Sequence, residues 1–203
     1  MGKIADFFMR VAQATLPAQP PAPTTAAPAM SKVGAPDGWK PSLGLLAAMV
    51  ALKPRARETV QFFLDRGCPL HEACGWAAQA HGESSFIAHI TGDKRDGVAT
   101  AFGMFQMHPV RCDAIKAGCG VDMRALPPME DQLRGVWWEL QHTEHAAFKK
   151  VQATANAYDA GFVACKYFER PANQAVDCPK RGGYAQAWYD LFKSEGLTAK
   201  KGA

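Results

Sequence analysis

The sequence lacks the long apolar segments that mark a membrane-spanning or exported protein. Its clearest apolar run, Leu43 to Leu52, falls well short of the roughly 20 residues that a bilayer requires. We therefore expect this run to form a buried helix that packs over the domain. The apolar stretch at the start of the chain is interrupted by Asp6 and Arg10, so we expect no secretory signal peptide.

Metal-binding motifs, regular strand patterns and a strong charge imbalance are also missing. The chain contains neither C-x-x-C nor H-E-x-x-H, so we expect no metal and no other cofactor. Alternation of apolar and polar residues is rare, whereas apolar residues at helical spacing recur, which predicts an all-α fold. The formal net charge of +4 suits approach to an anionic surface but is too weak to indicate nucleic-acid binding.

Composition divides the 203 residues into four segments. Residues 1–16 can form a short amphipathic helix, which can dock on another protein, lie on a membrane or simply fray. Residues 17–41 are rich in Pro and Ala and predict an extended linker. Residues 42–195 have the apolar content of one folded domain, and 196–203 predict a flexible basic tail.

Six cysteines are many for a chain made in a reducing cytoplasm. Their even number permits disulfides after export, but sequence alone does not rank the pairings. Two pairs, Cys112 with Cys119 and Cys165 with Cys178, are close enough in sequence to close small loops.

Most of the chemical information lies between residues 81 and 111. Apolar and small residues recur at helical spacing from Pro69 to Ala80, and Gly82 is expected to end that helix. Glu83 would then lie where a buried helix opens into a cleft, among bulky aromatic residues. Exclusion of water raises the pKa of a carboxyl group and allows it to donate a proton near neutral pH.

The residues from Glu83 onward resemble the signature of the phage tail lysozyme family, a branch of the lysozyme-like superfamily that includes goose-type lysozymes and soluble lytic transglycosylases. The matching blocks are ESSF at 83–86, GD at 92–93, AFGMFQ at 101–106 with His108, and YFERP at 167–171. The resemblance covers roughly residues 54 to 193.

The resemblance implies a two-lobed helical domain with a small β-like flap at residues 84–100 and a substrate cleft. It implies cleavage of the β-1,4 bond between N-acetylmuramic acid and N-acetylglucosamine in peptidoglycan, with Glu83 as the acid. Gly103 and Gln106 would face the substrate, since a glycine admits a sugar close to the backbone and an amide can bind an acetamido group. Such an enzyme would be carried in a phage particle, where residues 1–16 can dock on a virion protein, and would act on the cell wall in the host periplasm.

The second catalytic group is left open by the sequence. Asp93 matches the family motif and Asp96 lies on the same loop, so either can orient a water molecule, and both can equally be solvated loop charges. Lytic transglycosylases dispense with this group and form 1,6-anhydro products. The segment Asn156 to Gly161 resembles their A-Y-N-A-G motif, although Asp159 replaces its asparagine.

Several residues carry two interpretations. His108 can contact a saccharide or merely start a helix, and Tyr158 can reach the acid or the N-acetyl group or pack in the core. Glu169 and Arg170 can form an ion pair that ties the last helices together.

Two other functional classes are considered. A lysozyme-like module without activity could serve as a structural or wall-binding virion protein. A cysteine peptidase would need a Cys, His and Asn or Asp arrangement, which Cys74 and His81 do not provide. Further helices are expected at residues 57–66, 104–116, 130–150, 154–168 and 183–195, with 130–150 as the central one.

Overall fold

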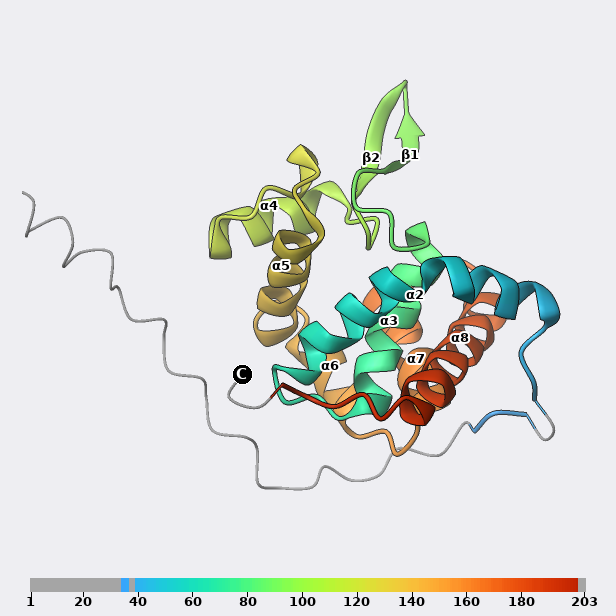
Figure 1. Ribbon diagram of the computed structural model, residues 1–203. Coiled ribbons are helices and arrows are strands. Elements are labelled where there is room, and N and C mark those ends of the chain that lie inside the picture. The colour runs from blue at the N-terminus through green and yellow to red at the C-terminus, as the bar shows by residue number, and fades with distance from the viewer. Residues whose placement is uncertain (1–33, 37–38, 201–203) are drawn as a thin grey trace, which may run out of the picture.

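The computed structural model describes residues 34–36 and 39–200. The expected N-terminal helix at 1–16, most of the expected linker and the last three residues lie outside this range. The helices are α2 (Leu43–Leu64), α3 (Leu70–Ser84), α4 (Pro109–Cys119), α5 (Met129–Gln141), α6 (His145–Gln152), α7 (Ala157–Ala164) and α8 (Gln174–Ser194). Two strands, β1 (Thr91–Arg95) and β2 (Val98–Phe102), a 3₁₀ turn at Met123–Ala125 and a π-helical turn at Cys165–Glu169 complete them (Figure 1). The described part of the chain is therefore mainly α-helical, as the sequence predicted.

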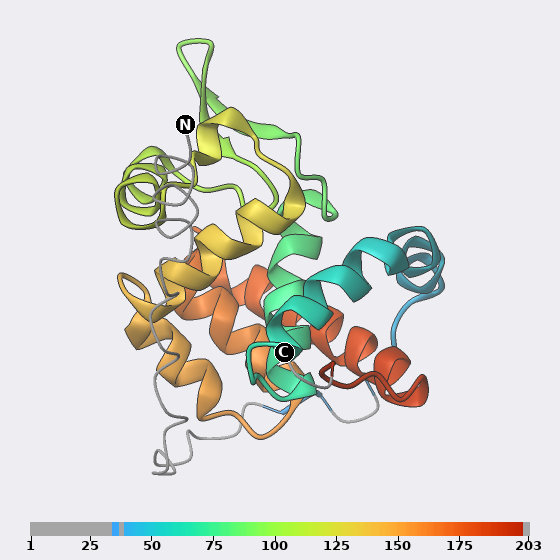
Figure 2. The same ribbon diagram turned by 60° about the vertical axis from the view of Figure 1, so that its left-hand side comes forward.

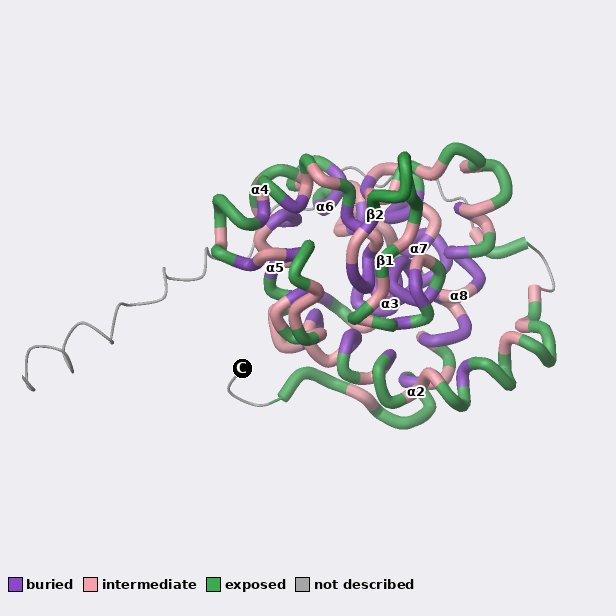
Figure 3. The backbone as a smooth tube through the Cα atoms, turned by 90° about the horizontal axis from the view of Figure 1, so that it is seen from above, coloured by how far each residue is buried: buried purple, intermediate pink, exposed green. Residues whose placement is uncertain are grey.

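Helix α3 is the centre of the domain and packs against α2, α7 and α8. Figure 3 shows that the most buried backbone runs through α3, α7 and α8. These helices approach closely because small residues meet at their crossings: a Cβ atom on Gly75 would lie 2.8 Å from Cβ of Ala160, and one on Gly161 would lie 2.6 Å from Cβ of Ala185. Close packing of helix backbones thus fixes α3, the helix that carries Glu83.

The β-hairpin projects from one end of the helical body (Figures 1 and 2). Strands β1 and β2 are antiparallel, with Gly92 opposite Ala101 and Arg95 opposite Val98. The two-residue turn between them, Asp96 and Gly97, has positive φ at both positions (51° and 80°). Positive φ at both central residues is the geometry of a type I′ turn, for which Asp-Gly is a favoured pair. The small β-like flap expected at residues 84–100 is this hairpin.

The apolar run at residues 43–52 is not the buried helix that we expected. It forms the first half of α2, which continues through Pro54 to Leu64. Leu43 and Val50 are 85% and 77% exposed, and Met49 is the buried residue of this half. The reason is that this half of α2 extends beyond the helices on which its second half packs, so apolar side chains are left facing solvent (Figure 1).

The central helix expected at 130–150 is two helices. The chain breaks between α5 and α6 at His142, whose backbone angles of φ −125° and ψ −88° are not helical. The carbonyl of Glu139 there accepts hydrogen bonds from the amides of both His142 and Glu144. The central position belongs to α3 instead, because α3 packs against α2, α7 and α8, whereas α5 packs mainly against its neighbours α4 and α6.

Three helix boundaries that were predicted at glycines are wrong. Helix α4 runs past Gly118 and ends at Gly120, which adopts the left-handed conformation at φ +76°. Helix α3 runs past Gly82 to Ser84. Helix α8 begins at Gln174 rather than near Gly183, where a Cβ atom would lie 2.8 Å from the ring of Trp39. At Gly183, as at Gly82, the glycine allows another group to approach and does not mark a boundary.

The segment expected to be a flexible tail packs back on α2 over its described part, residues 196–200. The amide of Lys200 donates to Oδ1 of Asp65 at 2.8 Å, and Nε2 of Gln61 donates to the carbonyl of Thr198 at 3.0 Å. All six cysteines are free thiols. Among the described residues, no helix is both long and apolar enough to span a membrane.

Candidate active site

Glu83 is the second-last residue of α3, and its side chain is 23% exposed. Its Oε1 accepts a hydrogen bond of 2.5 Å from Nη2 of Arg181 on α8. Burial raises the pKa of Glu83, and the charge of Arg181 acts in the opposite direction. The net direction is upward, so the environment favours a carboxyl group that holds a proton at higher pH than a solvated glutamate.

Arg181 reaches Glu83 across a gap that only glycine leaves open. A Cβ atom on Gly82 would lie 0.8 Å from Nη1 of Arg181. The same guanidinium donates to the carbonyl of Gln79 at 3.3 Å, and the Arg181 side chain is 9% exposed. Gly82 therefore serves to seat a buried arginine beside the acid.

A second layer of charges lies behind this pair. Arg111 of α4 donates two hydrogen bonds of 2.7 Å to the carboxylate of Glu139, and its guanidinium lies 4.2 Å from the ring centre of Phe168. Its Nη1 is 3.9 Å from Oε2 of Glu169. The charge of Arg111 also lowers the pKa of Glu83. The two layers therefore belong to one electrostatic cluster.

The ion pair expected between Glu169 and Arg170 does not form. Arg170 donates two hydrogen bonds to Glu144 instead, at 2.7 and 2.8 Å. The two side chains part because Glu169 ends the π-helical turn and Arg170 follows in the left-handed conformation at φ +54°. Glu169 consequently faces the interior while Arg170 stays half exposed.

The two aspartates proposed as the second catalytic group lie at different points of the hairpin. Asp93 lies within β1 and is exposed, and its charge contributes to raising the pKa of Glu83. Asp96 is exposed at the tip of the hairpin, where its positive φ is accounted for by the turn. Asp177, in the first turn of α8, also raises the pKa of Glu83 and is half-buried.

Three residues of the family motif meet at the base of the hairpin. Gln106 donates from Nε2 to the carbonyl of Gly103 at 2.8 Å, and its Oε1 occupies the space beside Gly92, where a Cβ atom would lie 1.7 Å away. Gly103 itself has φ +72°, a conformation that favours glycine. The spacing of these residues in the sequence thus reflects one compact loop.

Buried hydrogen bonds hold this loop. Oγ of Ser84 donates to the carbonyl of Met104 at 2.8 Å, which joins the end of α3 to the loop. Gln132 of α5 is fully buried and accepts from the amide of Met104 at 2.7 Å. Its Nε2 donates to the carbonyls of Ala88 and Pro127 at 2.8 and 2.7 Å. Ser84 and Gln132 therefore fix the distance between the acid and the hairpin.

His108 and Tyr158 lie in contrasting places. His108 is exposed at the N-cap of α4, so its ring is accessible. Tyr158 is only 3% exposed and lies over Gly182, where a Cβ atom would be 2.9 Å from the ring. Its burial favours packing over contact with a saccharide.

Sequence reasoning missed Arg181, Asp177 and Gln132. Arg181 and Asp177 are four residues apart on one helix, yet nothing in that spacing points to Glu83, nearly one hundred residues earlier. Gln132 lies among the polar residues at the start of α5, so the sequence pattern suggests a surface position although the side chain is buried. None of the three carries a local signal that would have revealed its role.

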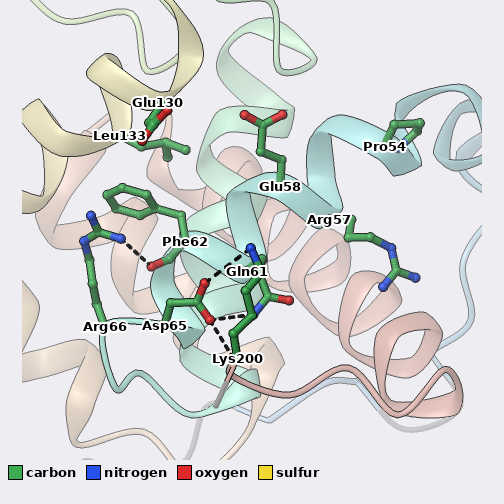
Figure 4. Close-up of a pocket in the computed structure, with 10 residues that line it drawn as sticks. All are labelled: Pro54, Arg57, Glu58, Gln61, Phe62, Asp65, Arg66, Glu130, Leu133 and Lys200. Atoms are coloured by element: carbon green, nitrogen blue, oxygen red, sulfur yellow. Dashed lines mark hydrogen bonds and ion pairs between the residues drawn. The ribbon is translucent and has the colours of Figure 1, made fainter. Parts of the chain in front are cut away.

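A pocket of about 530 Å³ opens elsewhere, between α2, the start of α5 and the C-terminal segment (Figure 4). Its lining includes Glu58, Arg66 and Lys200. None of its lining residues is among those whose charges act on Glu83. Its position therefore does not bear on the chemistry of that carboxyl group.

Comparison with known proteins returns a family model described as phage tail lysozyme, which matches residues 54–192. The matched span includes Glu83, the hairpin and Glu169. No curated protein matches the chain.

Proposed function

This chain belongs to the phage tail lysozyme family, and we propose that it is a muramidase, a glycosidase that cleaves the β-1,4 bond between N-acetylmuramic acid and N-acetylglucosamine. Membership supports a phage-associated, peptidoglycan-lytic protein that acts on the cell wall. The proposal rests further on the environment of Glu83. This carboxyl group is partly buried at the end of the central helix, and burial raises its pKa.

Glu83 would donate its proton to the glycosidic oxygen as the bond breaks. Once deprotonated, its carboxylate would be stabilised by the hydrogen bond from Arg181 at 2.5 Å. Arg181 thus favours the charged product of the proton transfer, whereas burial favours the protonated acid that begins it. General acid catalysis of this kind needs no cofactor.

We assign the second catalytic role to Asp93 in preference to Asp96. The reason is that the charge of Asp93 acts on Glu83, whereas Asp96 lies at the hairpin tip. An anion near the sugar can orient the attacking water or stabilise the oxocarbenium-like transition state. Asp177, half-buried and also felt by Glu83, is the competitor for this role.

The loop at the base of the hairpin would bind the sugar. The Gln106 amide can exchange its bond with Gly103 for one with an acetamido group. Gly103 is buried, and a Cβ atom there would lie 2.3 Å from Oε1 of Gln132, so we assign this glycine to the packing of the loop and not to direct contact with the sugar. His108, exposed at the start of α4, would contact the glycan beyond this point. We assign no substrate contact to Tyr158 because it is buried.

A lytic transglycosylase is the second candidate. It is favoured by the exposure of Asp93, because a solvated aspartate on a projecting hairpin is less suited to holding a water molecule than a buried carboxylate. In such an enzyme the substrate supplies the nucleophile and the product carries a 1,6-anhydro end. A structural or wall-binding protein without activity remains the third.

Mass spectrometry of fragments released from purified peptidoglycan distinguishes these functions. We expect the full chain to release fragments with reducing ends and Glu83→Gln to release none; anhydro ends would identify a transglycosylase. Asp93→Asn should lower activity far more than Asp177→Asn, with Asp96→Asn as the control at the hairpin tip. A folded protein that releases no glycan fragments from walls of several hosts would contradict the enzymatic proposal.

Carriage in the phage particle and action in the host periplasm complete the proposal. Residues 1–16 would bind a virion protein through their apolar side chains, which include those of Ile4, Phe7 and Val11. Deletion of these residues should remove the protein from purified particles without changing its activity on isolated walls.

A further inference from the structure

Glu169 is a buried carboxyl group that the proposed reaction does not use, and its bonding is incomplete. Its side chain is 7% exposed, and its Oε1 has no hydrogen-bond partner among the described residues. The cation nearest to it, Nη1 of Arg111, is 3.9 Å from Oε2, which is too far for a hydrogen bond. A buried carboxylate in this position would keep its charge without hydrogen-bonded compensation, which is unfavourable.

The two arginines of the cluster are bonded to other partners. Arg111 forms a bidentate pair with Glu139, and Arg181 donates to Glu83. The cluster therefore contains three carboxyl groups and two guanidinium groups. If all five were ionised, a net negative charge would be enclosed; one bound proton makes the cluster neutral.

Glu83 and Glu169 are the two places where that proton can reside. Glu139 already accepts two short hydrogen bonds from Arg111, which compensate its charge. Burial and the charge of Glu83 raise the pKa of Glu169 to about 8, while Arg111 and Arg181 act against this rise. The charge of Glu83 acts on Glu169, and because such an interaction is mutual, each carboxyl group responds to the state of the other. Arg111 and Arg181 act on both groups.

Two aspartates also contribute to the electrostatic environment of Glu83. Asp177 on α8 and Asp93 on β1 both disfavour its ionisation. Glu169 is faced by Glu139 of α5 in addition to the two arginines and Glu83. Its charge also acts on Arg170, the next residue, which is already paired with Glu144. Asp177 and Asp93 therefore act on Glu83 in the same direction as burial, and Arg181 and Arg111 oppose them.

We propose that Glu169 is a positioning residue that shares one proton with Glu83 and thereby keeps Glu83 able to donate near neutral pH. With the proton on Glu169, Glu83 is a carboxylate paired with Arg181. With the proton on Glu83, the acid is ready and Glu169 is the anion, facing Arg111. The catalytic consequence rests on the proposed function, whereas the sharing of the proton does not.

Carbon-13 NMR of the glutamate carboxyl groups tests the sharing without any substrate. The Glu83 signal is assigned by its loss in Glu83→Gln. In the wild type, this signal should move in two steps as pH rises, because the pair titrates with two macroscopic values. In Glu169→Gln it should move in one step, shifted to lower pH by about one unit or more, because the neighbouring negative charge is gone. Glu58→Gln, which removes an exposed carboxylate from α2, should leave it unchanged.

A single-step titration of Glu83 in the wild type, or an unshifted one in folded Glu169→Gln, would overturn the proposal. The pH profile of peptidoglycan cleavage supplies the catalytic readout. Its alkaline limb should move to lower pH in Glu169→Gln, whereas a purely structural role would lower activity equally at every pH. A shifted NMR titration in a protein that cleaves no glycan would leave the proton sharing intact and refute the muramidase instead.

Discussion

Replacement of Gly82 by alanine tests whether the seat of Arg181 is the reason for a glycine inside α3. The new Cβ atom would lie 0.8 Å from Nη1 and 1.8 Å from Cζ of Arg181, so the guanidinium must leave its place. It would then lose its hydrogen bonds to Glu83 and to the carbonyl of Gln79. Glu83 would be left without its cationic partner in a site where its side chain is 23% exposed.

Two opposing effects set the size of the change. Alanine favours the helix over glycine by about 1 kcal/mol. Loss of one partner from a largely buried ion pair costs about 3 kcal/mol. We therefore expect Gly82→Ala to lower the free energy of unfolding by about 2 kcal/mol near pH 7. Removal of Arg181 also raises the pKa of Glu83, since the charge of Arg181 lowers it, so the alkaline limb of any glycosidase activity should move to higher pH.

Urea unfolding measures the first effect, and Gly44→Ala is the matched control. Gly44 is also helical, but the nearest atom to its added Cβ would be Oγ of Ser42 at 3.9 Å, an ordinary contact. This control should be stabilised by up to about 1 kcal/mol. If Gly82→Ala were as stable as Gly44→Ala and its pH profile matched the wild type, Arg181 would not depend on the glycine and the reasoning would be refuted.

Three further predictions concern buried polar groups. Burial lowers the pKa of His81, which accepts a hydrogen bond from Trp188, from 6.5 to about 4. The free energy of unfolding should therefore fall by roughly 3 kcal/mol as pH falls from about 6.5 to 4. Urea titrations across this range should show that the free energy of unfolding depends less on pH in His81→Leu than in the wild type. The raised pKa of Glu169 acts with the opposite sign: its contribution to stability is present below pH 4.5 and is lost as pH rises toward 8, so Glu169→Gln should flatten this part of the stability curve. Gln132→Leu removes three buried hydrogen bonds and should cost about 3 kcal/mol, whereas Gln186→Leu on the exposed side of α8 should cost under about 0.5 kcal/mol; equal losses in the two variants would contradict this role for Gln132.

Local patterns were sufficient where a local cause shapes the chain. The His108-Pro109 pair does mark the start of α4, because proline is suited to the first turn of a helix. The polar, Gly-rich segment after Glu83 does form a small β element, and Asp96-Gly97 supplies its turn. Local patterns failed at Gly82 and Gly183, because each of these glycines makes room for a side chain from another part of the chain.

The candidate acid could be found from the sequence because Glu83 lies at the end of an apolar helical pattern and inside a known motif. Its partners could not. The packing of α3 and α8 brings Arg181 to Glu83, and Glu169 interacts with Glu83 through its charge; the neighbours of Arg181 and Glu169 in the sequence give no sign of either interaction. The expected pairing of Glu169 with Arg170 shows the same limit. In the structure Glu169 lies near Arg111, and Arg170 pairs with Glu144.

The sequence by itself determined the helical class, the presence of a small β element, the family motif and the choice of Glu83 as the candidate acid, because each depends on residues that are neighbours in the chain. The tertiary structure alone decided how that acid is charged. Burial, Arg181 and Glu169 act on Glu83 through space, and electrostatic interactions in a buried site depend on distance and solvent exclusion rather than on separation along the chain.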